Sequence, residues 1–451
     1  MSTALVILAA GKGTRMNSDL PKVLHPIAQA SMLEHAMRSG RALDPARTVV
    51  VAGHGADLVR NAVTEIDEEA EVVLQEEQLG TSHAVDQARE ALQGFEGDVV
   101  VLYGDTPFVS ADTLERMVAA RTSADLVILG FEAADPGRYG RLVMQGDSLE
   151  RIVEYKDATE AERALTFCNS GLMACDAALM FDLLAKIGND NASGEYYLTD
   201  LVELARTAGR TVTAVACDEA ETLGVNSRSD LARADALFQS KARAELMELG
   251  VTLMAPDTVY LAFDTVIGRD TVIEPNVVFG PGVTIESGAL IRAFSHLEGC
   301  HVSRGAKVGP YARLRPGAEL AEDTHIGNFV EIKNAEIAEG AKVNHLSYIG
   351  DASVGKASNI GAGTITCNYD GVMKHRTEIG ARSFIGSNTL LVAPVKVGNE
   401  AMTASGTVVT QDVEDGALAI ARAKQENKPG RARKLMDILR AKKARLVKGS
   451  E

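Results

Sequence analysis

A repeat with a period of six residues constrains the fold of this chain more than any other feature of its sequence. Twelve positions at steps of six, from Val266 to Ile332, carry aliphatic residues except at Thr284 and His296, and the period resumes from Ile379 to Val409. An α-helix cannot keep a six-residue repeat on one face, whereas short strands that turn at small residues and stack coil upon coil can. The repeat therefore predicts a parallel β-helix in the second half of the chain.

The repeat is interrupted once. Between Thr366 and Thr377 the period fails, so the segment from Cys367 to Gly371 is expected to project as a loop. Insertions on one face of a solenoid are often binding sites. If a coil takes three hexapeptides and strands lie ~4.8 Å apart, the roughly 170 repeat residues should form a prism on the order of 45 Å long.

The first half of the chain has a different pattern. Up to about residue 225, aliphatic runs alternate with amphipathic stretches, which predicts βα units and a mainly parallel sheet, that is, an α/β domain. Strands are expected at Thr3–Leu8, Thr48–Ala52, Val72–Gln75, Val99–Tyr103 and Leu126–Phe131, and helices at Met32–Leu43 and Thr81–Leu92, with Thr81 capping the second helix.

A segment rich in Ala, Leu, Arg and Glu joins the two halves and predicts a single linking helix that ends at Gly250. A chain of 451 residues also exceeds the usual size of one hydrophobic core. The expected organisation is an α/β domain over residues 1–228, a helical linker over 229–249, a β-helix over 250–421 and a basic tail over 422–451.

Composition excludes several classes of protein. The apolar run Ala4–Ala10 has no preceding basic residues and ends in a Gly-rich turn, so it reads as a buried strand, and no stretch reaches transmembrane length. The five cysteines are odd in number and never spaced as CxxC, which argues against a disulfide framework or a zinc site. A net charge of −16 disfavours nucleic-acid binding. We expect a cytoplasmic protein that binds neither membrane nor nucleic acid.

The charge is unevenly distributed. From Arg422 onward there are eleven Lys or Arg against three Asp or Glu. This composition is typical of a solvated, partly helical tail, and a second interpretation is that its first residues bind phosphate. The sequence leaves both open.

A Gly-rich turn directly follows the first expected strand. The run Leu8–Met16 reads LAAGKGTRM, and Pro21 and Lys22 come shortly after it. Glycines let the backbone approach phosphate oxygens, while Arg15 and Lys22 supply cations. The motif is neither a Walker A loop nor a GxGxxG fingerprint. Asp105 ends a buried strand at the position where open α/β sheets bind ligands and a hard metal such as Mg²⁺.

Together with the segment Gln78–Thr81, these motifs resemble those of sugar-nucleotide pyrophosphorylases. With a hexapeptide β-helix behind them, the chain resembles, over nearly its whole length, the bacterial family of N-acetylglucosamine-1-phosphate uridyltransferase/glucosamine-1-phosphate acetyltransferases. The resemblance implies a Rossmann-like nucleotidyltransferase domain followed by a left-handed, trimeric β-helix, with each acetyl-transfer pocket built between subunits.

For the N-terminal domain, the resemblance implies in-line attack of a sugar phosphate oxygen on the α-phosphorus of UTP, with pyrophosphate as the leaving group. Such chemistry needs positioning and charge neutralisation more than a general base. The resemblance implies that Arg15 and Lys22 are catalytic and that Asp105 and Asn226 bind Mg²⁺. Gln75, Gly80 and Thr81 would bind uracil, and Gly140, Glu154, Asn169 and Asn226 would surround the sugar and ribose. The full set of implied UTP and UDP-sugar contacts is Leu8, Ala9, Ala10, Gly11, Lys22, Gln75, Gly80, Thr81, Tyr103, Gly104, Asp105, Gly140, Glu154, Asn169 and Asn226.

The β-helix contains polar side chains that stacking does not need. A lone histidine on such a scaffold is more often structural than catalytic. However, the runs Arg315–Leu320, Gly327–Glu331 and Asn359–Gly371, with His345 and Tyr348, resemble the acetyltransferase site of the same family.

Carried over, the resemblance implies that His345 is the general base that removes a proton from the glucosamine amine as it attacks acetyl-CoA. Glucosamine-1-phosphate would be bound by Arg315, Lys333, Tyr348, Asn359, Asn368, Tyr369 and Lys374, and acetyl-CoA by Ala362, Asn368, Tyr369, Ser387, Ser405 and Arg422, with Ser405 standing where relatives commonly have Ala.

Three functions are compatible with these features. The first is a bifunctional enzyme that acetylates glucosamine-1-phosphate and then makes UDP-N-acetylglucosamine, a precursor of peptidoglycan and lipopolysaccharide. The second is a one-reaction pyrophosphorylase whose β-helix serves oligomerisation or regulation. The third is a non-catalytic trimeric scaffold. His345, Asn359 and Asn368 favour the first, because neither alternative needs them.

Overall fold

Residues 2–191 and 193–448 are described by a computed structural model, in which the chain forms two units. The first unit comprises the residues up to 245 together with 260–264, and the second comprises 246–259 and the residues from 265 onward. The elements of the first unit are β1 (Thr3–Ala9), β2 (Pro26–Ile27), β3 (Ala30–Ser31), α1 (Met32–Arg41), β4 (Arg47–Ala52), α2 (Ala56–Ile66), β5 (Glu71–Leu74), α3 (Thr81–Asp86), β6 (Asp98–Tyr103), α4 (Ala111–Ala120), β7 (Leu126–Glu132), β8 (Arg141–Gln145), β9 (Ser148–Val153), α5 (Glu160–Arg163), β10 (Phe167–Asp176), α6 (Ala177–Leu184), α7 (Leu201–Thr207) and β11 (Val212–Cys217).

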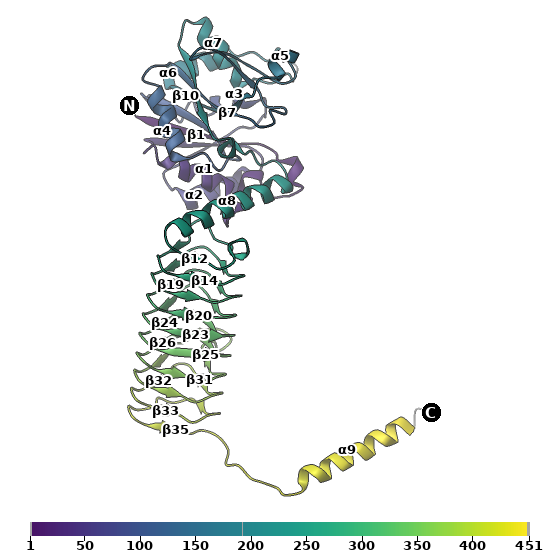
Figure 1. The fold of residues 1–451 in the computed structure, drawn as a ribbon, viewed down its shortest axis with the longest axis vertical. Coiled ribbons are helices and arrows are strands. Elements are labelled where there is room, and N and C mark those ends of the chain that lie inside the picture. Colours follow the sequence, from purple (N-terminus) through teal and green to yellow (C-terminus); the bar gives the residue numbers. More distant parts are fainter. Residues whose placement is uncertain (1, 192, 449–451) are drawn as a thin grey trace. The chain divides into compact units, whose positions relative to one another are not determined.

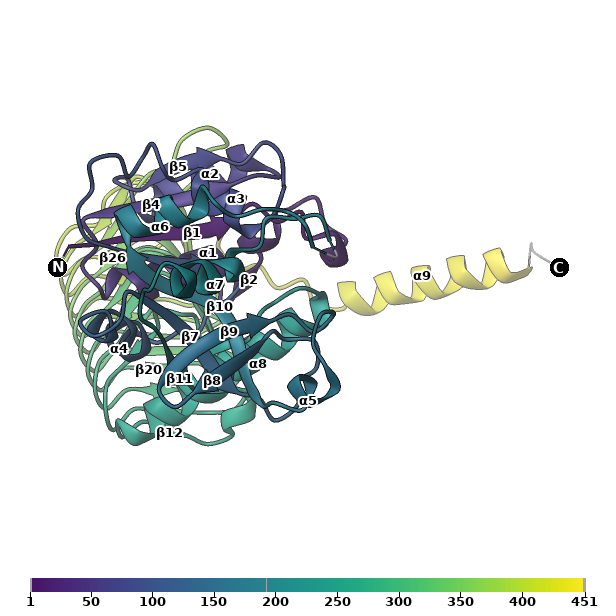
Figure 2. The same ribbon diagram turned by 90° about the horizontal axis from the view of Figure 1, so that it is seen from above.

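The centre of the first unit is a nine-stranded sheet in the order β11-β7-β10-β6-β1-β4-β5, with the hairpin β8–β9 paired to β10. The labelled strands of this path follow the same order from β5 to β11 in Figure 2. Every residue of β1 is buried, because parallel strands β4 and β6 flank it and helices cover both faces. The continuous apolar run at the start of the sequence is the consequence of this position.

Helices pack on both faces of the sheet (Figure 1). On one face, apolar side chains of α1, α2 and α4 join the core, among them Met37, Val63 and Met117. On the other face, α3, α6 and α7 contribute residues such as Val85 and Leu201. The predicted α/β domain is therefore confirmed as a three-layer Rossmann-like fold.

The sheet contains four strands that were not expected, β8, β9, β10 and β11, and one of them changes the character of the sheet. All five expected strands are present, each within one residue of its expected bounds, but β10 was not expected and runs antiparallel between β6 and β7. Its sequence mixes Gly171 and Asn169 with apolar residues, so it lacks the uniform aliphatic character of the other strands. The sheet is thus mixed, not mainly parallel in its centre.

The helix expected over Thr81–Leu92 was too long, and its cap was wrong. α3 ends at Asp86, and residues 87–94 continue as turns. Gly80, which has no side chain to cap with, holds the N-cap position, and the Thr81 hydroxyl accepts from the Leu198 N–H at 3.1 Å. The tertiary contact to a distant loop overrides the local capping preference.

The second unit is a parallel β-helix with three faces, confirming the left-handed hexapeptide fold (Figure 1). The first face is a ten-stranded ladder, which corresponds to about 43 Å at a strand spacing of ~4.8 Å. The first face contains β12 (Thr252–Leu253), β14 (Val272–Ile273), β17 (Leu290–Ile291), β20 (Lys307–Val308), β23 (His325–Asn328), β25 (Lys342–His345), β27 (Asn359–Ile360), β30 (Phe384–Ile385), β33 (Met402–Thr403) and β35 (Leu418–Ala419).

Two further ladders complete the prism. β24 (Glu331–Ile337) and β26 (Tyr348–Val354) are long enough to pass through a corner, so each belongs to both ladders. The second face also contains β15 (Val278–Phe279), β18 (His296–Leu297), β21 (Arg313–Leu314), β28 (Ile365–Cys367), β31 (Leu390–Val392) and β34 (Val408–Val409). The third face also contains β13 (Val266–Ile267), β16 (Thr284–Ile285), β19 (Cys300–Val302), β22 (Ala318–Leu320), β29 (Thr377–Ile379) and β32 (Val395–Val397).

The expected strict period of six was wrong in the first coils. In these coils the residue that points into the core is the one directly after each position of the predicted repeat, as at Ile285 and Leu297. Thr284 and His296 therefore point outward and do not interrupt the repeat. From Leu297 to the next inward residue, Val302, the step is five. The sequence pattern did not reveal this one-residue offset, because most of these two-residue strands contain two apolar residues and either of them fits a period of six. From Val302 to Ile332, and again from Ile379 to Val409, the counted residues do point inward.

The expected loop is present. β28 and β29 are separated by the residues between Cys367 and Thr377, where Tyr369 and Lys374 form an isolated antiparallel bridge and Val372 is 87% exposed. Registered partners on either side of the loop, such as Val354 and Ile379, are 25 positions apart instead of 17 or 18. The insertion therefore projects as a short hairpin without breaking the ladders.

Two long helices lie outside the sheets. α8 (Arg228–Glu248) matches the expected linking helix to within one residue at each end and crosses the boundary between the units. α9 (Arg431–Lys448) lies in the basic tail, whose described side chains up to Leu446 are all exposed. A solvated, partly helical tail is what its composition predicts. Among the helices of the described ranges, none has the length and apolar character needed to span a bilayer.

Candidate active sites

The loops that follow β1, β5 and β6 surround a cavity of about 350 Å³. In a sheet with parallel neighbours, the carboxyl ends of the strands meet at one edge, and ligands bind there. The lining includes most of the residues expected to bind UTP: Leu8, Ala9, Ala10, Gly11, Lys22, Gln75, Gly80, Thr81, Tyr103 and Asp105. Gln78 also lines it and donates to the Ala10 carbonyl oxygen at 2.8 Å, which ties this segment to the Gly-rich turn.

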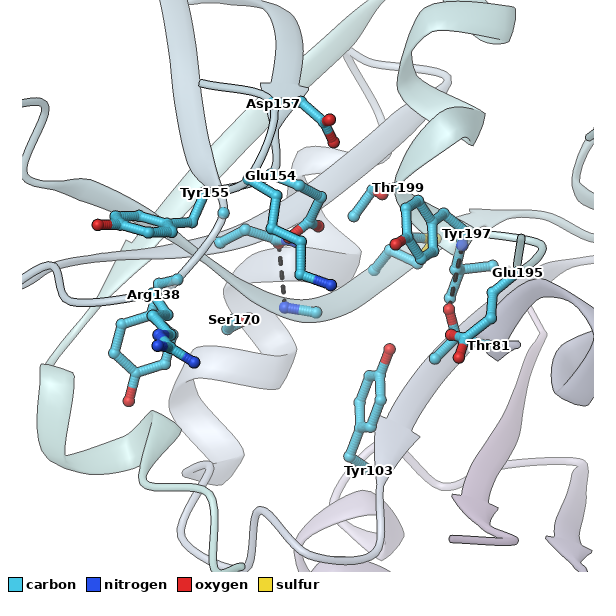
Figure 3. Close-up of a pocket in the computed structure, with 17 residues that line it drawn as sticks. Thr81, Tyr103, Arg138, Glu154, Tyr155, Asp157, Ser170, Glu195, Tyr197 and Thr199 are labelled. Carbon is cyan, nitrogen blue, oxygen red and sulfur yellow. Dashed lines mark hydrogen bonds between the residues drawn. The ribbon is translucent and has the colours of Figure 1, made fainter. Parts of the chain in front are cut away.

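A second cavity of about 680 Å³ adjoins the first and shares Thr81 and Tyr103 with it (Figure 3). Gly140, Glu154 and Asn169, which were expected around the sugar, line this cavity. The Asn169 N–H donates to the Gly140 carbonyl oxygen at 2.8 Å, so these two residues are held together. A nucleotide with an attached sugar has room to extend from one cavity into the other.

The two residues expected to bind metal converge on one point. Lys22 Nζ forms an ion pair with Asp105 and lies 3.1 Å from Asn226 Oδ1. A carboxylate oxygen and an amide oxygen that face the same cation are the kind of ligands that Mg²⁺ prefers. Asp105 and Asn226 therefore fit a magnesium ion, although they come from sequence positions more than a hundred residues apart.

Burial raises the pKa values of two groups that line the larger cavity, Glu154 and Tyr103. Burial, and then the charges of Asp157 and Asp200, raise the pKa of Glu154 above its ordinary value. The pKa of Tyr103 is raised well above its ordinary value by burial and by the charges of Asp105 and Glu154. Tyr103 is therefore a neutral hydroxyl group near neutral pH and is suited to hydrogen bonding.

Three expected contacts, Arg15, Gly104 and Asn226, line neither of the two cavities. Arg15 lies in a short 3₁₀ helix (Thr14–Met16), is exposed and lines neither of the two cavities. Gly104 is also absent from both linings, and its N–H donates to the Leu8 carbonyl oxygen at 2.9 Å. Conversely, Glu195 lines both cavities although no sequence motif indicated it. It comes from an irregular segment whose position only the fold decides.

In the β-helix, His345 ends β25 and has a partner that sequence motifs did not identify. Its Nδ1 lies 2.9 Å from Oδ1 of Asn328, which occupies the registered position in the preceding coil. An amide oxygen only accepts, so Nδ1 carries a proton, and in the neutral ring the lone pair is then on Nε2. This tautomer is the one that a general base at Nε2 requires. The register 17 residues apart is the signal that could have found Asn328.

Four of the six residues expected to bind acetyl-CoA follow one column of corners from His345, namely Ala362, Ser387, Ser405 and Arg422, whereas Asn368 and Tyr369 lie in the insertion after β28. The N–H groups of the next corner residues, Gly363, Asn388 and Gly406, donate to the carbonyl oxygens of His345, Ala362 and Ser387 respectively. Ser405 continues the column, and its carbonyl oxygen accepts a hydrogen bond from Arg422. Successive coils lie ~4.8 Å apart, so the column spans roughly 14 Å. An elongated ligand could follow it.

A second cluster surrounds Asp351. Its carboxylate accepts from Asn334 at 2.6 Å and from Asn368. The ammonium groups of Lys333 and Lys374 lie side by side. This contact, together with burial, lowers the pKa of Lys333 below its ordinary value. Such a pair favours an anion between them, which fits the phosphate of a sugar phosphate. Asp351 itself escaped sequence analysis because an isolated Asp in a solenoid carries no signal.

The remaining expected residues lie around these groups. Arg315 forms an ion pair with Glu331 at 2.9 Å, and Tyr369 on the hairpin donates to the Gly371 carbonyl oxygen at 2.6 Å. Tyr348 begins β26 beside Glu331 in register, and Asn359 lies on the first face between Lys342 and Phe384.

The histidine and the lysine pair lie at different corners of the prism. His345 precedes the corner between the first and second faces, whereas Lys333 and Asp351 lie where β24 and β26 pass from the second face to the third. Within the described chain, no hydrogen bond or ion pair joins His345 to this cluster. In one copy of the chain, the two groups of expected residues are therefore separate.

Comparisons with known proteins agree with this division. The family of MobA-like NTP transferase domains matches residues 5–170, and the bacterial transferase hexapeptide family (six repeats) matches residues 264–299. A protein named "Bifunctional protein GlmU" from Ruegeria sp. is 82% identical over 449 residues, covering 100% of both chains. Proteins of the same name from Ruegeria pomeroyi and Dinoroseobacter shibae are 80% identical (98% of this chain, 99% of the relative) and 67% identical (100% of both).

A solved structure of UDP-glucose pyrophosphorylase complexed with UDP-glucose is also matched, over 53% of this chain and all of that chain. Its TM-score is 0.45 and its identity 18%, a similarity too weak to bear on function.

Proposed function

This chain belongs to the GlmU family of bifunctional proteins, and we propose that each of its two units carries one of its two reactions. The chain is a bifunctional enzyme with uridyltransferase and glucosamine-1-phosphate acetyltransferase activities. It acetylates glucosamine-1-phosphate with acetyl-CoA and then transfers a uridylyl group from UTP to N-acetylglucosamine-1-phosphate. We assign the acetylation to the β-helix, residues 250–421, and the uridyl transfer to residues 1–228.

For uridyl transfer, we propose that the cavity behind the Gly-rich turn holds UTP and that the adjoining cavity holds the sugar phosphate. Lys22 neutralises the phosphates, while Glu154 and Asn169 orient the sugar. The sugar phosphate oxygen then attacks the α-phosphorus as the bond to pyrophosphate breaks. A Mg²⁺ ion bound by Asp105 and Asn226 would add charge stabilisation. The observation that carries this proposal is the convergence of Lys22, Asp105 and Asn226.

For acetyl transfer, we propose that His345 is the general base. Asn328 holds its Nδ1–H at 2.9 Å, so Nε2 is free to take a proton from the sugar amine. The amine nitrogen bonds to the acetyl carbon, the C–S bond breaks, and CoA leaves as the thiol after gaining a proton. Lys333 and Lys374 bind the sugar phosphate, and the column from Ala362 to Arg422 binds acetyl-CoA. The roles of Tyr369, Arg315 and Asn359 in the sugar pocket stay predictions.

The hexapeptide repeats and the relatives indicate an oligomer. We propose a homotrimer in which a neighbouring copy brings its half-site to His345, because one copy separates His345 from the Lys333 cluster. We also propose that the enzyme works in the cytoplasm, where its substrates and reduced cysteines belong.

A pair of assays tests the assignment of two separate sites. His345→Ala should abolish release of CoA thiol with glucosamine-1-phosphate and leave pyrophosphate release intact. Asp105→Ala should do the reverse, because it removes the carboxylate beside Lys22. Loss of both activities in either folded variant would contradict separate sites. A wild-type enzyme that releases pyrophosphate but never thiol would favour the one-reaction pyrophosphorylase.

A further inference from the structure

His83, on α3, makes a contact that the proposed uridyl transfer does not explain. It lies against Gln75, a residue only 4% exposed that follows β5 and lines the smaller cavity. Gln75 Nε2 lies 3.0 Å from His83 Nδ1 and 3.2 Å from the carbonyl oxygen of Gly80. The Gln75 amide is therefore held at its nitrogen end by two partners.

The partners decide which way the amide points. An amide has a donor end and an acceptor end of the same shape, so its orientation depends on its neighbours. The Gly80 carbonyl oxygen only accepts, which places Nε2 toward it. His83 Nδ1 must then accept the second Nε2 hydrogen, so the imidazole carries its own proton on Nε2. The Gln87 amide nitrogen lies 3.2 Å from that nitrogen, but it donates its hydrogen bond to the His83 carbonyl oxygen at 3.0 Å.

The consequence is a fixed pattern on the cavity wall. Both Nε2 hydrogens of Gln75 are used, while its Oε1 accepts from no residue that the structure describes. Gly80 also lines the cavity, and its N–H donates to no described acceptor. A Cβ on Gly80 would lie 2.5 Å from the Tyr196 carbonyl oxygen, so the backbone there admits only glycine. The wall presents an acceptor beside a donor.

This pattern matches one kind of nucleobase edge. Uracil offers an N3–H donor next to a carbonyl acceptor, whereas cytosine offers an N3 acceptor next to an amino donor. A site built to hydrogen-bond one pattern rejects the opposite one, because its own polar groups would stay unpaired. We propose that His83 is a positioning residue that fixes the acceptor end of the Gln75 amide toward the base and thereby selects uracil over cytosine. This inference rests on the proposed uridyl transfer.

The test measures nucleotide selectivity in the whole enzyme. His83→Leu removes the acceptor at Nδ1 and lets the Gln75 amide rotate, so kcat/KM for UTP should fall by about tenfold and the UTP-to-CTP ratio should fall by at least as much. His83→Asn keeps an acceptor near the position of Nδ1 and should restore most of the ratio. Pyrophosphate release with N-acetylglucosamine-1-phosphate is the readout, and ¹⁵N NMR of the His83 ring should show Nδ1 without a proton.

The outcomes distinguish a failure of the role proposed for His83 from a failure of the proposed uridyl transfer. If His83→Leu slows UTP and CTP equally, His83 is merely structural and the inference is overturned. A ring proton on Nδ1 overturns it as well, even if the leucine variant fails to fold. A wild-type enzyme that releases no pyrophosphate from UTP overturns the proposed uridyl transfer itself, and this inference with it.

Discussion

At the scale of single residues, the structure adds partners to the residues that the sequence singled out. Motifs identified His345, and the register identified Asn328 as the group that sets its tautomer. Motifs identified Gln75, and packing placed His83 against it. In both cases the functional atom is aimed by a neighbour from another strand or helix, which a linear motif does not contain.

Asn328→Ala should slow acetyl transfer by about tenfold, because the imidazole loses the acceptor that favours the tautomer with its proton on Nδ1. The fall should appear in kcat for thiol release, with KM for acetyl-CoA little changed. Asn328→Asp keeps an oxygen acceptor and serves as the matched control. An aspartate variant as slow as the alanine variant would argue against a role in setting the tautomer.

Asp351 gives a prediction for the dependence of stability on pH. Burial acts to raise its pKa, but hydrogen bonds from Asn334 and Asn368 and the charges of Lys333 and Lys374 hold it below the ordinary value of 3.8. A carboxylate with a lowered pKa contributes stability that is present above its unfolded-state pKa and is lost as pH falls through the folded-state value.

Asp351→Asn should therefore lower the free energy of unfolding by about 2 kcal/mol at pH 7, since it removes the charge and replaces one of the two acceptor oxygens by a donor NH₂ group. The difference from wild type should shrink as the pH falls below about 3.8. Calorimetric melting of both proteins across this range measures it. A difference that stays constant down to pH 3 would show that the carboxylate charge is not responsible.

At the scale of elements, the β-helix tolerates coils of unequal length. Steps of five residues, as from Leu297 to Val302, and the inserted hairpin after Cys367 leave the ladders in register. The reason is that only one inward side chain per strand must meet the core, while corners absorb the difference in positive-φ residues such as Gly299. We propose that the insertion contributes side chains to acetyl transfer and is not needed to form the ladders.

Shortening the hairpin tests this proposal. Replacing residues 368–376 by two glycines should remove Asn368, Tyr369 and Lys374 and abolish acetyl transfer. The ladder pairs on both sides, such as Val354 with Ile379, should persist, so far-ultraviolet circular dichroism should change little. Pyrophosphate release by the same variant is the internal control. Collapse of the β-sheet signal would show that the hairpin is needed for folding.

At the scale of the whole molecule, the residues that we propose for acetyl transfer lie at two corners of the β-helix. A half-site with a base and a half-site with two lysines need a second copy to face each other, as a closed rotational assembly provides. The oligomer is then part of the active site and not only a source of stability.

Complementation tests the shared site. His345→Ala and Lys333→Ala should each abolish acetyl transfer alone, because each removes one half-site. When both variants are produced together, mixed assemblies contain pockets with an intact His345 from one copy and an intact Lys333 from another, so thiol release should return in part. Mixing the two purified proteins without exchange is the control. Coexpressed variants that stay inactive although they assemble would place the whole site in one chain.

The sequence alone determined the two-unit architecture, the β-helix, the projecting hairpin and the motifs of both sites, because these depend on periodicity and on residues close together in the chain. Sequence motifs also indicated Asp105 and Asn226, but only folding brings them to the same Lys22. The antiparallel position of β10, the inward phase of the first coils and the end of α3 depended on packing against distant residues. Only the tertiary structure decided the partners Asn328, Asp351 and His83 and the separation of His345 from the lysine pair, since these follow from register between strands and coils.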